Sequence, residues 1–254
     1  MEMVNLYIVG TAGSGKTTLA GAFQHWMRNR GFEAIMVNLD PGAEQLPYDP
    51  DIDIRDWVKL EDVMDKYSLG PNGAQILCAD LITLNVQEIK RELDGFEAPY
   101  AVIDTPGQIE LFAFRPAFKM FINSLGRRSF LAFLIDPMLA RTPEGFVSLL
   151  LLSASTQFRF GFPFLNILSK VDLLDQQEVE KIVNWSVDCE SLYEALCASS
   201  PSMSKESFIE IFKALEALHA FTSKIAPISS NTLFGIEELY NAIQQVYMGG
   251  EDLV

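Results

Sequence analysis

The glycine-rich segment Gly10-Thr11-Ala12-Gly13-Ser14-Gly15-Lys16-Thr17 constrains the fold of this chain more than any other feature. It matches the pattern G-x-x-x-x-G-K-[ST] in full and directly follows the apolar run Val4–Val9. In this pattern the glycines let backbone N–H groups wrap around a phosphate, and the following helix presents its positive end. The lysine reaches the β- and γ-phosphates, and the Thr17 hydroxyl can complete a Mg²⁺ shell. The segment predicts a nucleotide site between a strand and a helix.

Short apolar runs alternate with amphipathic stretches along the rest of the chain. The runs are almost continuously apolar, as expected for strands buried on both faces of a parallel sheet. Thr142 and Pro143 predict the start of one of the helices between them. The predicted fold class is therefore α/β, a three-layer P-loop NTPase domain with a mostly parallel central sheet. The predicted strands are Val4–Val9, Ala34–Leu39, Tyr100–Ile103, Phe130–Ile135, Phe164–Leu168 and Ala226–Ile228.

Two segments are longer than connections between neighbouring strands require. Residues 40–99 contain two helical patterns interrupted at Gly70-Pro71-Asn72-Gly73. Residues 173–224 contain helical patterns at Gln176–Leu196 and at Lys205–Ala220. We predict a single domain over residues 1–254 that carries these two segments as helical insertions.

The chain is acidic, with 34 Asp and Glu residues, 19 Lys and Arg residues and a formal net charge of −15. This charge argues against broad binding to nucleic acid or to anionic membranes. Between Asp40 and Asp65, nine acidic residues stand against two basic ones, and this stretch is either a solvated surface or a switch region. Three cysteines without C-x-x-C spacing predict neither a disulfide framework nor a zinc site.

We expect a soluble, cytoplasmic protein. Strand-like residues begin almost at Met1, where a signal peptide would carry a basic and then an apolar segment. The most apolar run, Phe146–Ala154, is much shorter than the roughly 18 residues that span a bilayer.

A second motif, Asp104-Thr105-Pro106-Gly107-Gln108, ends the apolar run Tyr100–Ile103. A carboxylate at the end of a buried strand is placed to serve a bound metal, and the N–H of Gly107 is placed to contact a γ-phosphate. Gln108 is placed to orient an attacking water. Glu110 is placed to assist, although a surface glutamate at this position needs no functional reason.

The segment Ser169-Lys170-Val171-Asp172 follows the fifth predicted strand. The Asp172 carboxylate can accept hydrogen bonds from both N1–H and the N2 amino group of guanine, a pair that adenine does not offer. Ser169 departs from the usual Asn-Lys-x-Asp pattern. The later segment Ser229-Ser230-Asn231 is either an ordinary turn or a second contact with the base.

Taken together, these residues resemble the GPN-loop GTPases, a branch of the P-loop GTPase superfamily. Gly-Pro-Asn alone is an ordinary turn sequence, and its position between the acidic stretch and Asp104 makes it specific. The likeness covers most of the chain and is weakest across Gln176–Lys224. The matching segments are Gly10–Thr17, Asn38–Pro41, Tyr48–Pro50 with Asp53–Asp56, Gly70–Asn72, Asp104–Glu110, Ser169–Asp172 and Ser229–Gly235.

The resemblance implies a Mg²⁺-dependent hydrolysis of GTP to GDP by a dimer. Asn72 of one subunit would point its amide at the γ-phosphate and attacking water of the other. The metal would be held by Thr17, Asp40 and Asp104, and the water would be activated by Asp40, Gln108 or Glu110, among which we do not choose. The implied nucleotide-binding residues are Gly13, Ser14, Gly15, Lys16, Thr17, Thr18, Gly107, Lys170, Asp172, Ser229 and Ser230.

The resemblance also bears on partners. The chain looks most like the short archaeal members, which form homodimers, and the family links to RNA polymerase assembly imply a protein client. Direct binding to nucleic acid or to a membrane is not expected.

Two alternatives remain open, a P-loop kinase acting on a small molecule and an ATP-dependent assembly ATPase. A kinase lid usually carries arginines, and Leu173–Lys224 has none.

Overall fold

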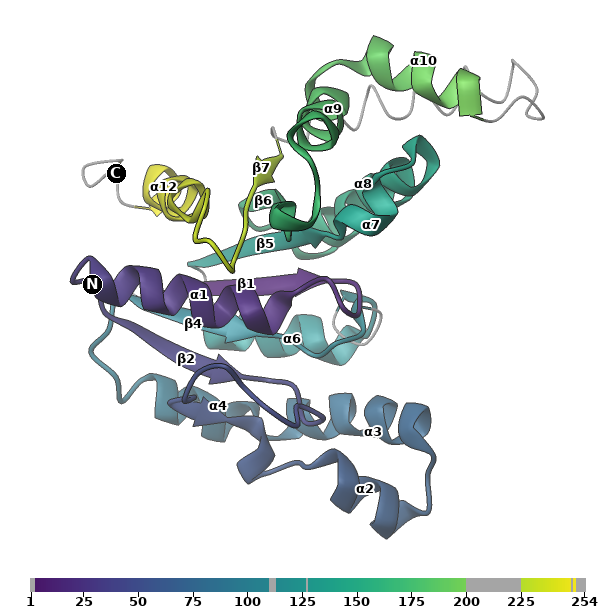
Figure 1. The fold of residues 1–254 in the computed structure, drawn as a ribbon. Helices are drawn as coiled ribbons and strands as arrows, with labels where there is room; N and C mark the ends of the chain where they lie inside the picture. The colour runs from purple at the N-terminus through teal and green to yellow at the C-terminus, as the bar shows by residue number, and fades with distance from the viewer. Residues whose placement is uncertain (1–2, 110–112, 127, 200–224, 248, 250–254) are drawn as a thin grey trace.

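A computed structural model describes residues 3–109, 113–126, 128–199, 225–247 and 249. The described residues form a seven-stranded, entirely parallel sheet in the order β3-β2-β4-β1-β5-β6-β7 (Figure 1). This arrangement confirms the predicted α/β class with a parallel sheet. The strands are β1 (Val4–Gly10), β2 (Ala34–Asn38), β3 (Ile52–Asp53), β4 (Tyr100–Asp104), β5 (Ser129–Ile135), β6 (Phe164–Leu168) and β7 (Ala226–Pro227).

The central strands of the sheet are buried on both faces. Every residue of β1, β4 and β5 is buried, which explains why these runs are continuously apolar. All six predicted strands are present with ends that differ by one residue at most. The prediction missed β3, because a two-residue strand has no periodicity to detect.

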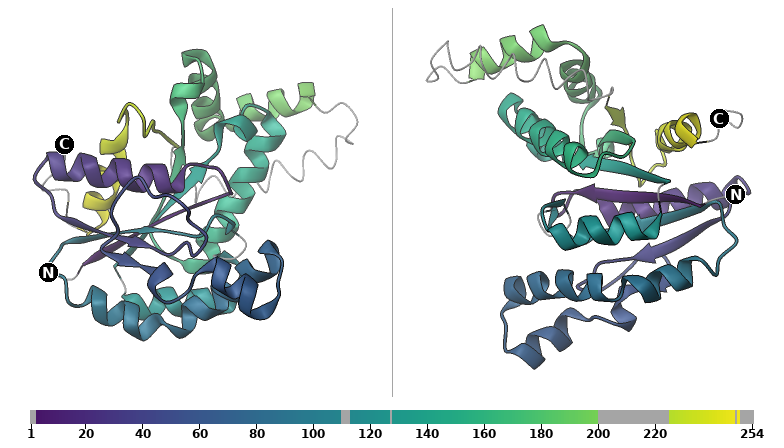
Figure 2. Two further views of the ribbon diagram at one scale, coloured as in Figure 1. Left: turned by 60° about the horizontal axis from the view of Figure 1, so that its bottom comes forward. Right: turned by 180° about the vertical axis from the view of Figure 1, so that it is seen from behind.

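Successive residues of β1 enter two different cores, which makes the fold three-layered. Leu6 and Ile8 pack with α1 (Lys16–Asn29) and α12 (Ile236–Tyr247), whereas Tyr7 and Val9 pack with the helices on the other face. Figure 2 shows the purple helix α1 and the blue helices of residues 60–93 on opposite sides of the sheet. The helices of the second face include α3 (Pro71–Leu84), α4 (Val86–Leu93), α6 (Pro116–Leu125) and α8 (Pro143–Phe160).

The first insertion differs from its prediction. Residues 40–99, all of which the structure describes, contain three α-helices, namely α2 (Leu60–Tyr67), α3 and α4. The predicted break lies between α2, which ends at Tyr67, and α3, whose N-cap is Gly70 and whose first turn begins at Pro71. Proline is favoured at this position, since the first turn needs no N–H donor from it.

The second insertion is described only in part. It contains α9 (Gln176–Val187) and α10 (Cys189–Ser199), which are separated at Asp188 where one helical pattern was predicted. The remaining short helices are α7 (Pro137–Ala140), η1 (Ile54–Asp56) and η2 (Val171–Leu173). The predicted helix Lys205–Ala220 lies outside the described residues. Within the described part of the chain, no helix is long and apolar enough to cross a membrane.

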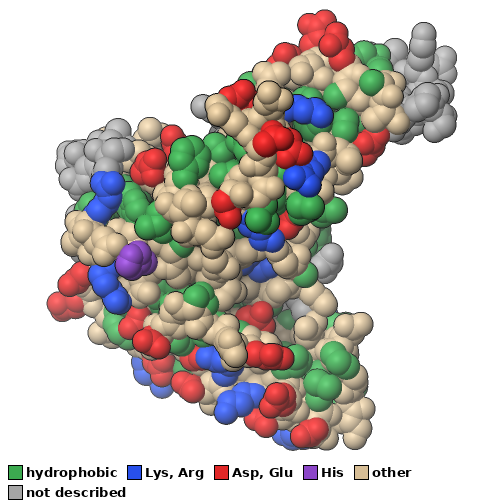
Figure 3. Space-filling model, in the orientation of Figure 1, with side chains coloured by type: hydrophobic (Ala, Val, Ile, Leu, Met, Phe, Trp, Pro, Cys, Tyr) green, Lys and Arg blue, Asp and Glu red, His purple; other side chains and the backbone are tan. Residues whose placement is uncertain are grey.

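The acidic stretch between Asp40 and Asp65 is mostly a solvated surface. Seven of its nine acidic side chains are exposed, and only Asp40 and Asp53 are partly buried. Figure 3 shows Asp and Glu side chains interspersed with Lys and Arg over the lower part of the molecule, where this segment lies. Most of the acidic side chains therefore face solvent, and a role in the site is left for Asp40 and Asp53.

The turn that precedes α12 depends on Gly235, which has φ +75°. A Cβ atom there would lie 2.2 Å from the carbonyl oxygen of Pro227. We therefore expect Gly235→Ala to lower the free energy of unfolding by about 2–4 kcal/mol in a urea titration. Gly161 has φ +70° with open space around it, so Gly161→Ala should lower it by only about 1 kcal/mol. If Gly235→Ala and Gly161→Ala lowered the free energy of unfolding equally, the close approach to the Pro227 carbonyl would not be the cause of the loss at Gly235.

Candidate functional site

The glycine-rich loop joins β1 to α1 and contains a buried ammonium group. Lys16 is 5% exposed, and its Nζ donates hydrogen bonds to the carbonyl oxygens of Gly10 at 3.1 Å, Thr11 at 3.0 Å and Gly107 at 2.9 Å. The loop can bend this tightly because Gly13 and Gly15 have φ of +74° and +98°. Lys16 thereby connects the loop after β1 to the loop after β4.

The loop also carries polar atoms without partners. The hydroxyl oxygens of Thr11 and Ser14 are buried and have no hydrogen-bond partner among the described residues. Gly15, the N-cap of α1, has no side chain to satisfy the first N–H groups of the helix. A site with free donors at a helix start is suited to an anion such as a phosphate.

Asp104 lies at the end of β4, beside Ile8 of β1 and Asn38 of β2. It is fully buried, and burial raises the pKa of its carboxyl to about 6, although hydrogen bonds from Thr17 and Tyr48 lower it. The Tyr48 hydroxyl donates to its Oδ2 at 2.9 Å. Among the described residues, Oδ1 is buried and has no hydrogen-bond partner.

Asp40 follows β2 and lies at the same edge of the sheet. Burial raises the pKa of its carboxyl, while the backbone N–H groups of Gly42 and Gly107 and the charge of Lys16 oppose that increase. Its turn is fixed by Asn38, whose Oδ1 accepts from the Asp40 N–H at 3.0 Å and whose Nδ2 donates to Asp53 at 2.9 Å. The structure therefore holds two carboxylates of raised pKa beside one lysine.

These carboxylates form a donor set that fits a small divalent cation. Buried acids are stabilised in their charged form by a nearby positive charge, and the free Oδ1 of Asp104 is a vacant acceptor for one. Thr17 supplies a hydroxyl, which together with carboxylates and phosphate oxygens is typical of Mg²⁺ sites. The described residues contain no cluster of three or more His, Cys, Asp or Glu that could hold a metal without a ligand.

The remaining predicted residues of the phosphate end divide into two groups. Gly107 and Gln108 line a small cavity together with Asp40, so these three are brought together. Asn72 is exposed in the first turn of α3. Glu110 lies outside the described residues.

The other end of the site centres on Asp172. Ser229 Oγ donates to its Oδ1 at 2.7 Å, and Asn231 Nδ2 donates to its Oδ2 at 2.9 Å. Both hydrogen bonds lower the pKa of this carboxyl, and the one from Ser229 has the larger effect. The Ser229-Ser230-Asn231 segment is thus not an unrelated turn, because it orients an ionised Asp172.

Ser169 and Lys170 link Asp172 to the glycine-rich loop. Ser169 Oγ donates to the carbonyl oxygen of Ser14 at 2.8 Å, so the residue that departs from the Asn-Lys-x-Asp pattern still binds the loop. Lys170 Nζ donates to the Gly13 carbonyl and lies 3.2 Å from Asp136. A pocket of about 140 Å³ lies between these segments and is lined by Ser14, Gly15, Thr18, Ser169, Lys170, Asp172, Leu173, Ser230 and Asn231.

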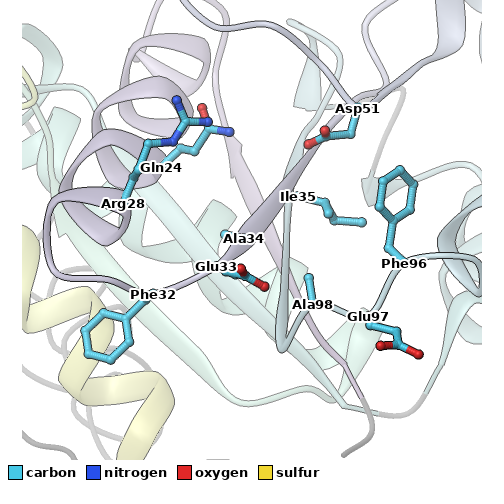
Figure 4. A pocket seen from close by; sticks show the side chains of 10 residues that line it. All are labelled: Gln24, Arg28, Phe32, Glu33, Ala34, Ile35, Asp51, Phe96, Glu97 and Ala98. Carbon is cyan, nitrogen blue, oxygen red and sulfur yellow. The ribbon is translucent and has the colours of Figure 1, made fainter.

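A larger pocket, of about 420 Å³, lies elsewhere (Figure 4). It is lined by Gln24 and Arg28 of α1, by residues at the start of β2, and by Phe96 and Glu97 before β4. It therefore opens at the amino ends of the strands, whereas ligands of parallel α/β sheets bind at the carboxyl ends. None of the predicted site residues lines it.

Sequence reasoning assigned no role to Tyr48, Asn38 or Asp136. Each contacts a predicted site residue that is distant in sequence or fixes a turn through its side chain, and no local pattern indicates such a contact. Only the Tyr48-Asp49-Pro50 match pointed to the neighbourhood of Tyr48.

The raised pKa of Asp104 predicts a pH-dependent stability of the metal-free protein. A carboxyl whose pKa rises on folding, here from 3.8 to about 6, makes the folded state lose stability as pH increases between these values. Such a shift corresponds to about 3 kcal/mol. We therefore expect Asp104→Asn to raise the free energy of unfolding at pH 7.5 by about 1–3 kcal/mol.

Urea titrations in a metal chelator would measure this gain, which should shrink progressively from pH 6 to pH 4. The exposed acid Asp62 provides the control, because Asp62→Asn removes a charge that folding does not bury. If Asp104→Asn were less stable than the wild type at pH 7.5, the buried Asp104 carboxylate would not be unfavourable, and the prediction would be wrong.

Known proteins resemble this chain in sequence and in structure. Residues 8–249 match the family described as "Conserved hypothetical ATP binding protein". A GPN-loop GTPase from Arabidopsis thaliana is 38% identical over 172 residues, which make up 66% of this chain and 58% of that protein. GPN-loop GTPase 3 from Debaryomyces hansenii is 33% identical over 222 residues, 86% of this chain and 80% of that protein.

A solved structure extends the likeness to the whole fold. The apo form of a GTPase from Pyrococcus abyssi has a TM-score of 0.84 and 29% sequence identity, over 97% of this chain and 99% of that one. The match to two of the curated relatives, from Arabidopsis thaliana and Dictyostelium discoideum, spans 58% and 55% of their length. On the extent of these matches, the chain belongs to the family of the GPN-loop GTPases.

Proposed function

We propose that this protein is a Mg²⁺-dependent GTP hydrolase that works as a dimeric, nucleotide-driven switch or assembly factor. The observation that carries the proposal is the pair of contacts on Asp172. Ser229 and Asn231 fix an ionised carboxylate at the same edge of the sheet as the glycine-rich loop. A phosphate site and a guanine-reading carboxylate on one edge are what a GTP site requires.

Asp172 favours guanine over adenine. A carboxylate is acceptor-only, so it pairs with the N1–H and N2 amino donors of guanine and finds no such pair on adenine. A site that expects hydrogen bonds rejects a base lacking them, because its polar atoms would remain unpaired. The family description names ATP, but the names of the curated relatives and the chemistry of Asp172 favour GTP.

At the phosphate end, backbone N–H groups of Gly13–Gly15 and the Lys16 ammonium would receive the β- and γ-phosphates. Thr17, Asp40 and Asp104 would hold Mg²⁺, which supplies positive charge to the phosphate oxygens when bound. Asp40, Gln108 and Glu110 remain the three candidates that would orient or activate the attacking water. Of these, Asp40 and Gln108 line one cavity with Gly107.

The dimer is proposed from the exposure of Asn72 and from its neighbours. Asn72 lies in the first turn of α3, and α3 packs beside α6. Large apolar side chains on and near these helices are exposed, among them Ile76, Leu84, Phe114 and Met120. Such a surface is suited to covering by a second copy of the chain, which would bring Asn72 to the partner's γ-phosphate.

The biological role is proposed by family analogy alone, as assembly of RNA polymerase or a similar protein client in the cytoplasm. Two rivals are kept, a P-loop kinase acting on a small molecule and an ATP-dependent assembly ATPase. A kinase transfers phosphate to an acceptor, whereas the proposed enzyme releases it to water.

The base preference can be tested by phosphate release from GTP, ATP and xanthosine triphosphate. We expect the wild type to favour GTP over ATP by about 100-fold or more in kcat/KM, because a guanine-reading carboxylate left unpaired is strongly unfavourable. Asp172→Asn should lower this preference and favour the xanthine nucleotide, whose carbonyl oxygen at C2 accepts a hydrogen bond where the 2-amino group of guanine donates one. The exposed Asp175→Asn change, next to the site, should leave it unaltered. Preference for ATP in the wild type would contradict the proposal.

The in-trans role of Asn72 can be tested by mixing two variants. Asn72→Ala and Gln108→Leu should each slow hydrolysis, and an equimolar mixture should recover about a quarter of the wild-type rate. Half of the dimers would be mixed, and each would hold one complete site. Specific activity of the wild type should also rise with protein concentration. A mixture no faster than the average of its components would contradict the arrangement.

A further inference from the structure

A small cavity of about 10 Å³ lies at the phosphate end of the site. Its walls come from three segments, namely the turn after β2 with Asp40, the turn after β4 with Gly107 and Gln108, and helix α3 with Gln75. Its volume is close to the minimum that holds one water molecule, and a buried water needs two to four polar partners. The wall residues offer that number of polar groups.

Gln75 contributes an atom that the rest of the structure does not explain. Its Oε1 is buried and has no hydrogen-bond partner among the described residues. Buried side-chain oxygens are almost always hydrogen-bonded, so an unpaired one calls for a ligand or water that it serves. The apolar neighbours Ala79 and Ile82, on the same helix, offer it no alternative donor.

The cavity lies next to the position that the γ-phosphate is expected to occupy. Lys16, which reaches the β- and γ-phosphates in loops of this type, donates to the Gly107 carbonyl at 2.9 Å. The N–H of Gly107 in turn donates to Asp40. The groups that would orient the water, Asp40 and Gln108, and the group that would contact the phosphate, Gly107, therefore line the same cavity as Gln75.

We propose that Gln75 positions the attacking water in the active site of its own subunit, by accepting a hydrogen bond through Oε1. This inference rests on the proposed GTP hydrolysis. As the water oxygen bonds to the γ-phosphorus, the bond from phosphorus to the bridging oxygen breaks, and GDP and phosphate leave. The proton lost by the water passes to phosphate or solvent, and Gln75 only accepts a hydrogen bond.

The consequence is a division of labour along α3. Gln75 lies one helical turn after Asn72, so the two residues are close on one rigid element. Gln75 serves the site of its own subunit, whereas Asn72 serves the site of the partner. One helix thus contributes to two active sites of a dimer.

A kinetic measurement tests the role of Gln75. Gln75→Met keeps the length of the side chain and removes the acceptor, so kcat for GTP should fall about tenfold with KM and GTP affinity unchanged. Gln87→Met on α4 replaces an exposed glutamine and is the matched control, with kcat unchanged. An unaltered kcat in Gln75→Met, or a rise in KM with kcat retained, would overturn the proposal.

Mixing experiments separate the role in its own subunit from a structural role through Asn72. Gln75→Met mixed with Asn72→Ala should recover about a quarter of the wild-type rate, because each mixed dimer holds one complete site. Gln75→Met mixed with Gln108→Leu should recover nothing, since both defects lie in their own subunit's site. Recovery in the second mixture alone would show that Gln75 acts on the partner's site and overturn the proposal.

The same mixtures distinguish an error in the role of Gln75 from an error in the proposed function. If Asn72→Ala mixed with Gln108→Leu recovers activity and Asn72→Ala mixed with Gln75→Met does not, only the role of Gln75 is wrong. If neither mixture recovers activity, the in-trans arrangement itself is wrong, and the kcat of Gln75→Met alone then decides the role of Gln75.

Discussion

The ammonium group of Lys16 is the interaction on which the rest of the site depends. A buried cation is strongly unfavourable without partners, and Lys16 offers three donors that meet the carbonyl oxygens of Gly10, Thr11 and Gly107. One of these oxygens belongs to the last residue of β1, one to the loop that follows it and one to the loop after β4. A phosphate that binds the Lys16 ammonium must therefore compete with the hydrogen bonds that connect the glycine-rich loop to the loop after β4. The nucleotide and the turn that carries Gly107 and Gln108 are coupled through one side chain.

The buried carboxylates differ from Lys16, because burial disfavours their charged form. Asp40 and Asp104 are unfavourable as ions in a buried place, and burial raises the pKa of both. A cation at this place would relieve that penalty, so binding Mg²⁺ with the nucleotide would stabilise the protein as well as the phosphates. The net charge of −15 is not an obstacle, because most acids of the stretch between Asp40 and Asp65 are exposed and only Asp40 and Asp53 turn inward.

The sequence indicated the fold well, because parallel strands buried on both faces leave an unbroken apolar pattern and the glycine-rich loop has a strict spacing. It was less informative where structure depends on contacts between distant segments. Ser169 departs from its pattern, yet its hydroxyl binds the Ser14 carbonyl, a contact across most of the chain. Tyr48 binds Asp104 and Gln75 faces the cavity beside Asp40, and neither lies in a periodic pattern that predicts it. The two-residue strand β3 was missed because pairing with β2, not its own sequence pattern, defines it.

Helix α3 gives the proposed dimer a physical basis for coupling its two sites. Asn72 and Gln75 are one turn apart on a helix that packs against α2 and α6, so a shift of this helix would move both side chains together. If γ-phosphate in one subunit fixes the water on Gln75, it also biases the position from which Asn72 reaches the partner. Coupling of this kind is reciprocal, since each site must change the affinity of the other by the same factor. A neutral amide in place of an arginine would keep this coupling while hydrolysis stays slow, which suits a device that reports nucleotide state rather than one that consumes GTP rapidly.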